Sequence, residues 1–175
     1  LHEFGYDACM CRLRESLLIF LLALVIGCGQ SDPVAVAEEK PKAKGLAGII
    51  ETADKMLLYE GLPHQMYEAQ QLEAERKDTP TVELHKYPFY KEPLPMKPAD
   101  KKKLETLLGD PKTFKPFSGE KKCGGFHPDF AVEWQRGQDR HRVLLCFGCK
   151  EAKLFGPSGE HRKDLNRAAF NQLKE

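Results

Sequence analysis

The feature that most constrains the fold of this chain is a pair of strand-like runs in its last third. Residues 129–135 (DFAVEWQ) alternate apolar and polar side chains with a period of two, which is typical of a strand that buries one face. Residues 141–147 (HRVLLCF) are rich in residues that favour strands, and the polar segment 136–140 has the composition of a turn. We therefore predict a β-hairpin with a loop of about five residues.

Shorter runs add strands and helices to this hairpin. Apolar stretches bounded by glycine or proline predict three more strands, over residues 55–60, 82–90 and 151–155. The second of these contains Pro88, which cannot donate to a ladder, so we place it at a sheet edge. Strong helix formers with apolar residues at helical spacing predict three helices, over residues 64–77, 101–108 and 164–173. The sum is an α+β fold, a small antiparallel β-sheet with two to three helices packed on one face.

Three cysteines lie at the two ends of the predicted hairpin. Cys123 precedes its first strand, and Cys146 and Cys149 end its second. An antiparallel hairpin brings these ends together, within the Cα separation of roughly 4.4–6.8 Å that a disulfide requires. We prefer a Cys123–Cys149 bridge, because Cys146 can serve as a core residue of the strand, and a Cys123–Cys146 bridge is the alternative. Closing such a loop would stabilise the fold by about 3 kcal/mol.

Two other interpretations of the same residues stay open. Cys123 and His127, together with Cys146 and Cys149, supply three thiolates and one imidazole, a ligand set that tetrahedral zinc accepts. The Cys146–Cys149 segment (CFGC) could instead cycle between dithiol and disulfide, although reactive pairs of this type usually sit at a helix N-terminus and this pair ends a strand. An oxidising compartment would favour the structural disulfide over both.

The N-terminal region carries the most apolar stretch of the chain. Residues 17–26 (LLIFLLALVI) are ten apolar residues in a row, whereas a membrane-spanning helix needs about 20. The run has the length of the hydrophobic region of a secretory signal peptide, and Arg12 and Arg14 supply the positive charge that precedes such a region. The segment is therefore predicted to direct export rather than to span a membrane.

The residues that end this run, Val25-Ile26-Gly27-Cys28, resemble the lipobox of bacterial lipoproteins. The resemblance implies cleavage before Cys28 and attachment of lipid to its thiol. It also implies a location in the cell envelope, outside the cytoplasm, where the acyl chains anchor the protein to a membrane.

The chain is predicted to divide into three parts. Residues 1–27 form the signal peptide, of which residues 1–9 are expected to lie ahead of the true start, since Met10 begins a better signal sequence. Residues 28–45 combine small, charged and proline residues without a period and form a lipidated tether. Residues 46–175 form a single α+β domain.

The domain also resembles a group of uncharacterised bacterial envelope proteins. The resemblance rests on residues 123–129 (CGGFHPD), on residues 146–149 (CFGC) and on the hairpin between them. Residues 58–65 (LYEGLPHQ) are similar to the same group. The resemblance implies an envelope location and no specific activity.

Charge and motifs limit the function. The chain has 27 Lys and Arg against 26 Asp and Glu, which argues against a strongly basic binding surface, so no nucleic-acid partner is expected. The sequence contains no phosphate-binding glycine motif and no serine-nucleophile motif. His64 is interpreted as a residue that hydrogen-bonds the start of a helix, and a base of a functional site is the alternative.

We therefore expect a protein that is not an enzyme. It would be a binding or structural module held at the membrane by its lipid anchor, with an unknown envelope protein or a small ligand as its partner, and no cofactor is expected for it. The alternative is a thiol–disulfide or zinc-binding protein that uses Cys123, His127, Cys146 and Cys149.

Overall fold

The computed structural model describes residues 45–175. The predicted signal peptide, the lipobox residue Cys28 and the predicted tether up to residue 44 lie outside the described residues. Within residues 45–175, no helix has both the length and the apolar character needed to cross a membrane.

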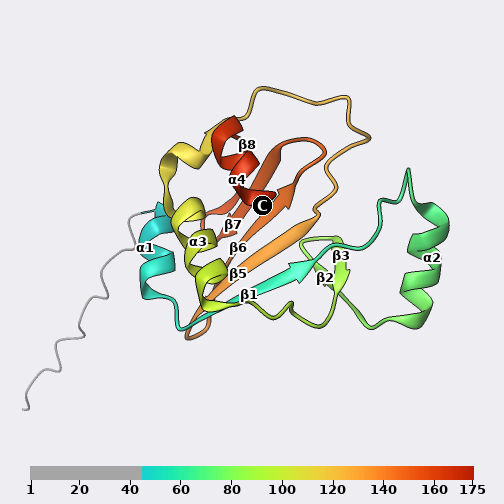
Figure 1. The fold of residues 1–175 in the computed structure, drawn as a ribbon, viewed down its shortest axis with the longest axis horizontal. Helices are drawn as coiled ribbons and strands as arrows, with labels where there is room; N and C mark the ends of the chain where they lie inside the picture. Colours follow the sequence, from blue (N-terminus) through green and yellow to red (C-terminus); the bar gives the residue numbers. More distant parts are fainter. Residues whose placement is uncertain (1–44) are drawn as a thin grey trace, which may run out of the picture. The chain divides into compact units, whose positions relative to one another are not determined.

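The described residues form a mixed fold around one antiparallel sheet (Figure 1). The helices are α1 (Gly45–Thr52), α2 (Ala69–Asp78), α3 (Pro98–Gly109) and α4 (Arg167–Leu173), with a short 3₁₀ turn η1 (Pro111–Thr113). The strands are β1 (Lys55–Glu60), β2 (Thr81–Leu84), β3 (Tyr87–Tyr90), β4 (Phe114–Pro116), β5 (Phe130–Arg136), β6 (Asp139–Cys146), β7 (Glu151–Gly156) and β8 (Gly159–Leu165). Six strands pair in the order β1-β5-β6-β7-β8-β4, and β2 and β3 form a separate hairpin. The α+β class is confirmed, with a larger sheet than the sequence predicted.

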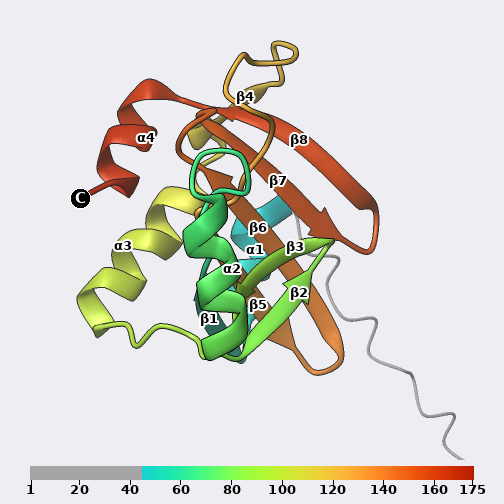
Figure 2. The same cartoon turned by 90° about the vertical axis from the view of Figure 1, so that its right-hand side faces the viewer.

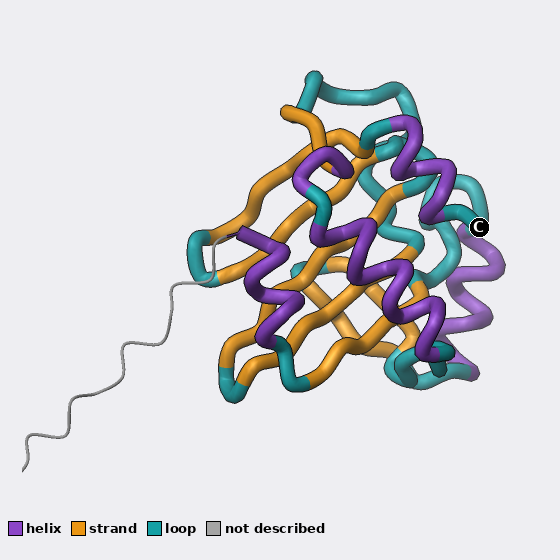
Figure 3. The backbone as a smooth tube through the Cα atoms, turned by 60° about the vertical axis from the view of Figure 1, so that its left-hand side comes forward, coloured by secondary structure: helices purple, strands orange, loops and turns teal. Residues whose placement is uncertain are grey.

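Three helices, α1, α3 and α4, cover one face of the six-stranded sheet (Figure 3). Alternate residues of the central strands point to this face, and Val132 and Trp134 of β5 and Val143 of β6 are fully buried there. Leu108 of α3 joins them, as do partly buried apolar residues of α1 and α4. Because side chains alternate along a strand, the period of two seen in the sequence selects this face for the main core. The predicted packing of helices on one face is confirmed.

The opposite face is covered by the β2–β3 hairpin (Figure 2). Leu84 and Phe89 of the hairpin are buried against Ala131 of β5 and Leu144 of β6. Ala131 and Leu144 are adjacent in their strands to residues that face the helices, so they point to the opposite face. Both faces of the central strands are therefore covered. This second layer was not predicted from the sequence.

The hairpin accounts for one error of the sequence prediction, since residues 82–90 span two strands rather than a single edge strand. His85 and Lys86 form the turn between β2 and β3, and both have a positive φ, of 52° and 70°. Two-residue hairpin turns of this kind favour Asn and Gly, so a His-Lys pair gave no turn signal. The turn of the central hairpin is also shorter than predicted, because only Gly137 and Gln138 separate β5 from β6.

The helices also differ from the prediction. The first two residues of the predicted helix 164–173 belong to strand β8, and α4 begins only after Asn166, whose side chain accepts a hydrogen bond from the Ala168 N–H at 3.0 Å. The helix predicted from residue 64 begins at Ala69, after a turn. Helix α1 was not predicted from the sequence, and its first residue, Gly45, was placed at the end of the tether.

Candidate functional site

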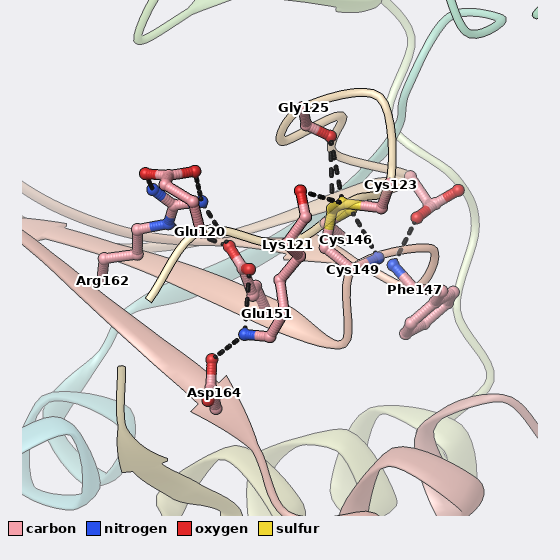
Figure 4. The surroundings of a disulfide bond; sticks show 11 residues. Glu120, Lys121, Cys123, Gly125, Cys146, Phe147, Cys149, Glu151, Arg162 and Asp164 are labelled. Atoms are coloured by element: carbon pink, nitrogen blue, oxygen red, sulfur yellow. Dashed lines mark hydrogen bonds and ion pairs between the residues drawn. A yellow bond between two sulfur atoms is a disulfide. The ribbon is translucent and has the colours of Figure 1, made fainter. Parts of the chain in front are cut away.

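A disulfide at one end of the sheet defines the first part of the site (Figure 4). The sulfur atoms of Cys123 and Cys149 lie 2.00 Å apart and their Cα atoms 5.7 Å apart, and this is the pairing that the sequence analysis preferred. Cys123 lies in residues 117–129, the segment between β4 and β5 that we call the disulfide loop, and Cys149 lies in the turn between β6 and β7. The bond therefore ties the disulfide loop to the end of the central strands.

Cys146 is the third of these cysteines, and its thiol is free and almost fully buried at the end of β6. Its Sγ accepts a hydrogen bond from the Cys149 backbone N–H at 3.3 Å. Burial raises the pKa of the Cys146 thiol, and the backbone N–H groups of Cys149 and His127 oppose this only in part. A thiol with a raised pKa carries little thiolate at neutral pH and is a poor nucleophile.

An ion cluster under the disulfide loop holds it against the sheet (Figure 4). Glu151 of β7 is fully buried, and its carboxylate accepts hydrogen bonds from Lys121 at 3.1 Å and from Arg162 at 2.9 Å. Lys121 also donates to Asp164 at 2.6 Å, and Arg162 donates to Glu120 at 2.7 Å. A buried carboxylate is stable only when it is paired, so Glu151 fixes the position of the loop residues that reach it. The cluster also explains why β8 has a polar sequence.

The segment that follows β1 packs against the disulfide loop at two glycines. Gly61 donates its N–H to the Asp129 carbonyl at 2.8 Å, and a Cβ at position 61 would lie 2.1 Å from the carbonyl oxygen of Pro128. Gly124 has a φ of +80°, and a Cβ there would lie 2.9 Å from the hydroxyl of Tyr67. Both positions therefore require glycine, and residues 61–68 and 123–129 form one continuous surface.

This packing brings His64 and His127 together. Their ring centroids lie 4.5 Å apart, with the planes inclined by 46°, and the ring of Tyr67 lies 4.6 Å from that of His64. The Nδ1 atom of His64 accepts the backbone N–H of Met66 at 3.0 Å, so the imidazole hydrogen-bonds the turn before α2. The ring proton of neutral His64 is therefore assigned to Nε2, which is buried and has no hydrogen-bond partner among residues 45–175.

The surroundings of His127 favour its neutral imidazole. Burial lowers the pKa of His127, and the charge of His64 lowers it further, against weaker opposing effects of Asp129 and Glu68. Both carboxylates are already hydrogen-bonded. Asp129 accepts the Phe147 N–H at 2.6 Å, and Glu68 accepts the His64 N–H at 2.7 Å.

The histidine pair lines several cavities. One, of about 170 Å³, lies between α2, the β2–β3 hairpin and the disulfide loop, and we call it the histidine cavity. A second cavity, of about 160 Å³, lies between the pair and the disulfide. His127 also lines a third, of about 250 Å³, beside Gly61. The lining of the histidine cavity includes the side chains of His64, Arg76, Lys86, Tyr87, Phe126 and His127.

The structure brings Cys123, His127, Cys146 and Cys149 to one place, as the sequence analysis expected, but not as a set of zinc ligands. Two of the three sulfur atoms are consumed by the disulfide, and a disulfide sulfur is not a thiolate. Within residues 45–175, no group of three or more His, Cys, Asp or Glu side chains is arranged to hold a metal ion. The oxidised arrangement therefore does not fit the proposed zinc site.

Comparison of the chain with protein-family models, with curated proteins and with solved structures gave no match.

Arg76 and Lys86 were not identified from the sequence, and His64 was assigned to the start of a helix, with a base of a functional site as the alternative. Arg76 lies near the end of a predicted helix, and Lys86 lies in what was predicted to be one strand. Only the packing of α2 and the β2–β3 hairpin beside the disulfide loop brings them to His127. One signal was available, because residues 58–65 and 123–129 both belong to the resemblance to envelope proteins, and each contains one histidine of the pair.

Proposed function

We propose that this chain is a lipid-anchored protein of the cell envelope whose domain binds a partner or a small ligand at the histidine cavity and catalyses no reaction. The observation that carries the proposal is the convergence of two imidazoles, an unpartnered buried N–H of His64 and a cavity at one end of the domain. Ligand sites combine a concave surface with a small number of placed polar groups in this way.

The surface next to the cavity supports a binding role. Two large apolar side chains of the described residues are strongly exposed, Met66 at 62% and Tyr67 at 68%. Both lie in the short turn between His64 and α2, so the exposed apolar groups adjoin the histidine pair. Adjacent exposed apolar side chains at the rim of a cavity favour contact with a partner.

The disulfide supports the proposed location. Disulfides form and persist outside the cytoplasm, in compartments that lack the reducing systems of the cell interior. A Cys123–Cys149 bond agrees with export directed by residues 17–26 and with anchoring through Cys28. Membrane attachment at Cys28 would hold the domain at the membrane and leave the histidine cavity for its partner.

Thiol–disulfide chemistry is the second candidate, favoured by the contact between Cys146 and the Cys149 N–H beside the disulfide. In an exchange, the Cys146 thiolate would attack the Cys149 sulfur, form a Cys146–Cys149 bond and release Cys123 as a thiolate. The raised pKa of Cys146 opposes the first step. Alkylation of the native protein at neutral pH, followed by peptide mapping, separates the two: exchange labels Cys123, whereas a structural disulfide leaves Cys123 and Cys149 linked.

Binding at the cavity is tested by nuclear magnetic resonance of the histidine rings in the full chain. Four small probes, benzoate, benzamide, benzylamine and cyclohexanol, are titrated separately. We expect at least one to shift the ring signals of His64 and His127 with a saturable dependence on concentration, and to leave the exposed His161 unchanged. If no probe shifts the signals of the pair more than that of His161, the proposed binding site is wrong.

The anchor is tested by expressing the full chain in bacteria and determining the mass and the membrane association of the mature protein. We expect a protein that begins at Cys28, carries acyl chains and is released from membranes only by detergent. The variant Cys28→Ser should lose the acyl chains, whereas the control Cys11→Ser should retain them. A mature protein that begins at another residue would overturn the lipoprotein proposal.

A further inference from the structure

The charges around the histidine cavity have one sign. Its wall includes His64, His127, Arg76 and Lys86 and contains no carboxylate side chain. Arg76 and Lys86 are both exposed, and neither forms an ion pair with a carboxylate of residues 45–175. Two cations and two imidazoles around a cavity without a carboxylate favour a negatively charged occupant.

The two cations reach the cavity from different elements. Leu72 of α2 is buried and lines the cavity, and Arg76 follows it by one helical turn, so both side chains share the face that α2 turns toward the hairpin. Lys86 comes from the β2–β3 turn. The cavity thus lies between an arginine on a helix and a lysine on a hairpin turn, so that an anionic group in it would be approached from two sides.

The turn that carries Lys86 is strained. A positive φ of 70° is unfavourable for a lysine, and the sequence that normally relieves such a turn is Asn-Gly. His85, its partner in the turn, stacks on Phe155 with centroids 3.7 Å apart and contacts Arg142, so His85 has a structural reason to be there. Lys86 is exposed, and no contact like those of His85 holds it in the described part of the chain. Because Lys86 lines the histidine cavity, contact with a ligand there would explain its unfavourable backbone conformation.

The cavity also has an aromatic wall. The rings of Tyr87 and Phe126 pack edge to face with centroids 5.4 Å apart, and both line the cavity. Lys153 lies behind them, 5.5 Å and 5.1 Å from the two ring centroids, and is paired with Glu160 at 2.8 Å. Apolar groups of a ligand can therefore pack on aromatic faces next to the cationic groups.

We infer that the histidine cavity binds a small organic anion. A carboxylate or phosphate group is held by Arg76 and Lys86 beside the two imidazoles, and a short apolar group packs on Tyr87 and Phe126. The volume of about 170 Å³ corresponds to roughly six water molecules, which limits the ligand to a small molecule or the end of a chain. This inference rests on the proposed binding function and adds the ligand class to it.

The experiment compares probes of one shape and different charge, by calorimetry and by the histidine ring signals of the full chain. Benzoate should bind, and benzamide, its neutral isostere, should bind weaker by about tenfold or more, because one charge-assisted contact contributes a free energy of that order. Binding of phenyl phosphate would show that a phosphate group can replace the carboxylate. Comparison with inorganic phosphate would show whether the aromatic ring is needed. Benzylamine, which is positively charged, should not bind.

Two variants of equal charge provide the control. Arg76→Gln/Lys86→Gln should weaken benzoate binding by about tenfold or more, and Lys77→Gln/Lys91→Gln, which removes two cations outside the cavity, should leave it unchanged. Equal weakening by both variants would mean a long-range charge effect and would overturn the inference.

The outcomes also separate this inference from the proposed function. If benzamide binds as tightly as benzoate and shifts the ring signals of His64 and His127, the cavity is a binding site but not an anion site. If none of the probes shifts those signals, the binding function itself is wrong. Saturable binding of benzoate that depends on Arg76 and Lys86 supports both.

Discussion

Removal of the Cys123–Cys149 disulfide is the perturbation whose effect follows most directly from the structure. The bond closes a loop with a sequence separation of 26 residues. The loss of chain entropy in the unfolded state for a loop of this length corresponds to about 3.5 kcal/mol at 25 °C. We expect the double variant Cys123→Ala/Cys149→Ala to lose about this free energy of unfolding, which for a domain of this size lowers the melting temperature by roughly 10 °C.

The assay is equilibrium unfolding in urea, with and without a dithiol reductant, followed by tryptophan fluorescence. The chain has one tryptophan, Trp134, and its side chain is completely buried in the core, so its emission reports global unfolding. Cys9, Cys11 and Cys28 are replaced by serine in every sample, so that thiols outside the described residues do not exchange. The slope of the free energy with urea should increase on reduction, because the unfolded chain then becomes less compact.

The controls distinguish the effect of losing the disulfide from the effect of shortening the two cysteine side chains. Reductant should destabilise the parent protein and the variant Cys146→Ala by similar amounts, and it should leave Cys123→Ala/Cys149→Ala unchanged. Loss of the reductant effect in Cys146→Ala would show that Cys146, rather than Cys149, is bonded. A parent protein whose unfolding midpoint does not move, although peptide mapping shows the bond to be reduced, would refute the entropic argument.

Three further predictions test the support of the site. Gly61→Ala should destabilise the domain by about 1–3 kcal/mol, because the added Cβ meets a backbone carbonyl that cannot move freely, whereas Gly148→Ala, which has open space around it, should be neutral in the same urea assay. Glu151→Gln should destabilise the domain by about 2–3 kcal/mol, because Lys121 and Arg162 lose the buried carboxylate that joins them and each keeps one other carboxylate, and Glu120→Gln, at an exposed site, serves as the control with a much smaller effect. The pKa of His127 lies below its ordinary value of 6.5, so the unfolded chain takes up this proton first as the pH falls. Stability should therefore decline as the pH falls below about 7, and His127→Gln should reduce that decline. An unchanged decline in the variant would count against the assignment.

The core strands could be predicted because their pattern is local. Residues 129–135 and 141–147 alternate or concentrate strand-forming side chains, and the structure confirms them as β5 and β6. The location of the cysteines at the ends of that hairpin then restricts which of them can approach each other. These predictions involve only segments that are close together along the chain, so the local sequence pattern is sufficient to make them.

The polar strand β8 and the β2–β3 turn could not be predicted in the same way. Strand β8 (GEHRKDL) is polar because Arg162 and Asp164 belong to an ion cluster whose other members come from β7 and the disulfide loop. The turn at His85 and Lys86 uses residues that are unfavourable at positive φ, so local propensity argued against it. In both cases, contacts with distant segments outweigh the local preference.

By itself, the sequence determined the class of the fold, the central hairpin and the neighbourhood of Cys123, Cys146 and Cys149. It also carries the basis for the proposed envelope location, because export and lipidation signals are read from a linear segment. Only the tertiary structure decided that Cys149 is the bonded partner, and that His64 and His127 face each other at a cavity rimmed by cations. Those groups come from four separate segments, and their approach depends on the packing of two layers on the sheet, which no local pattern encodes.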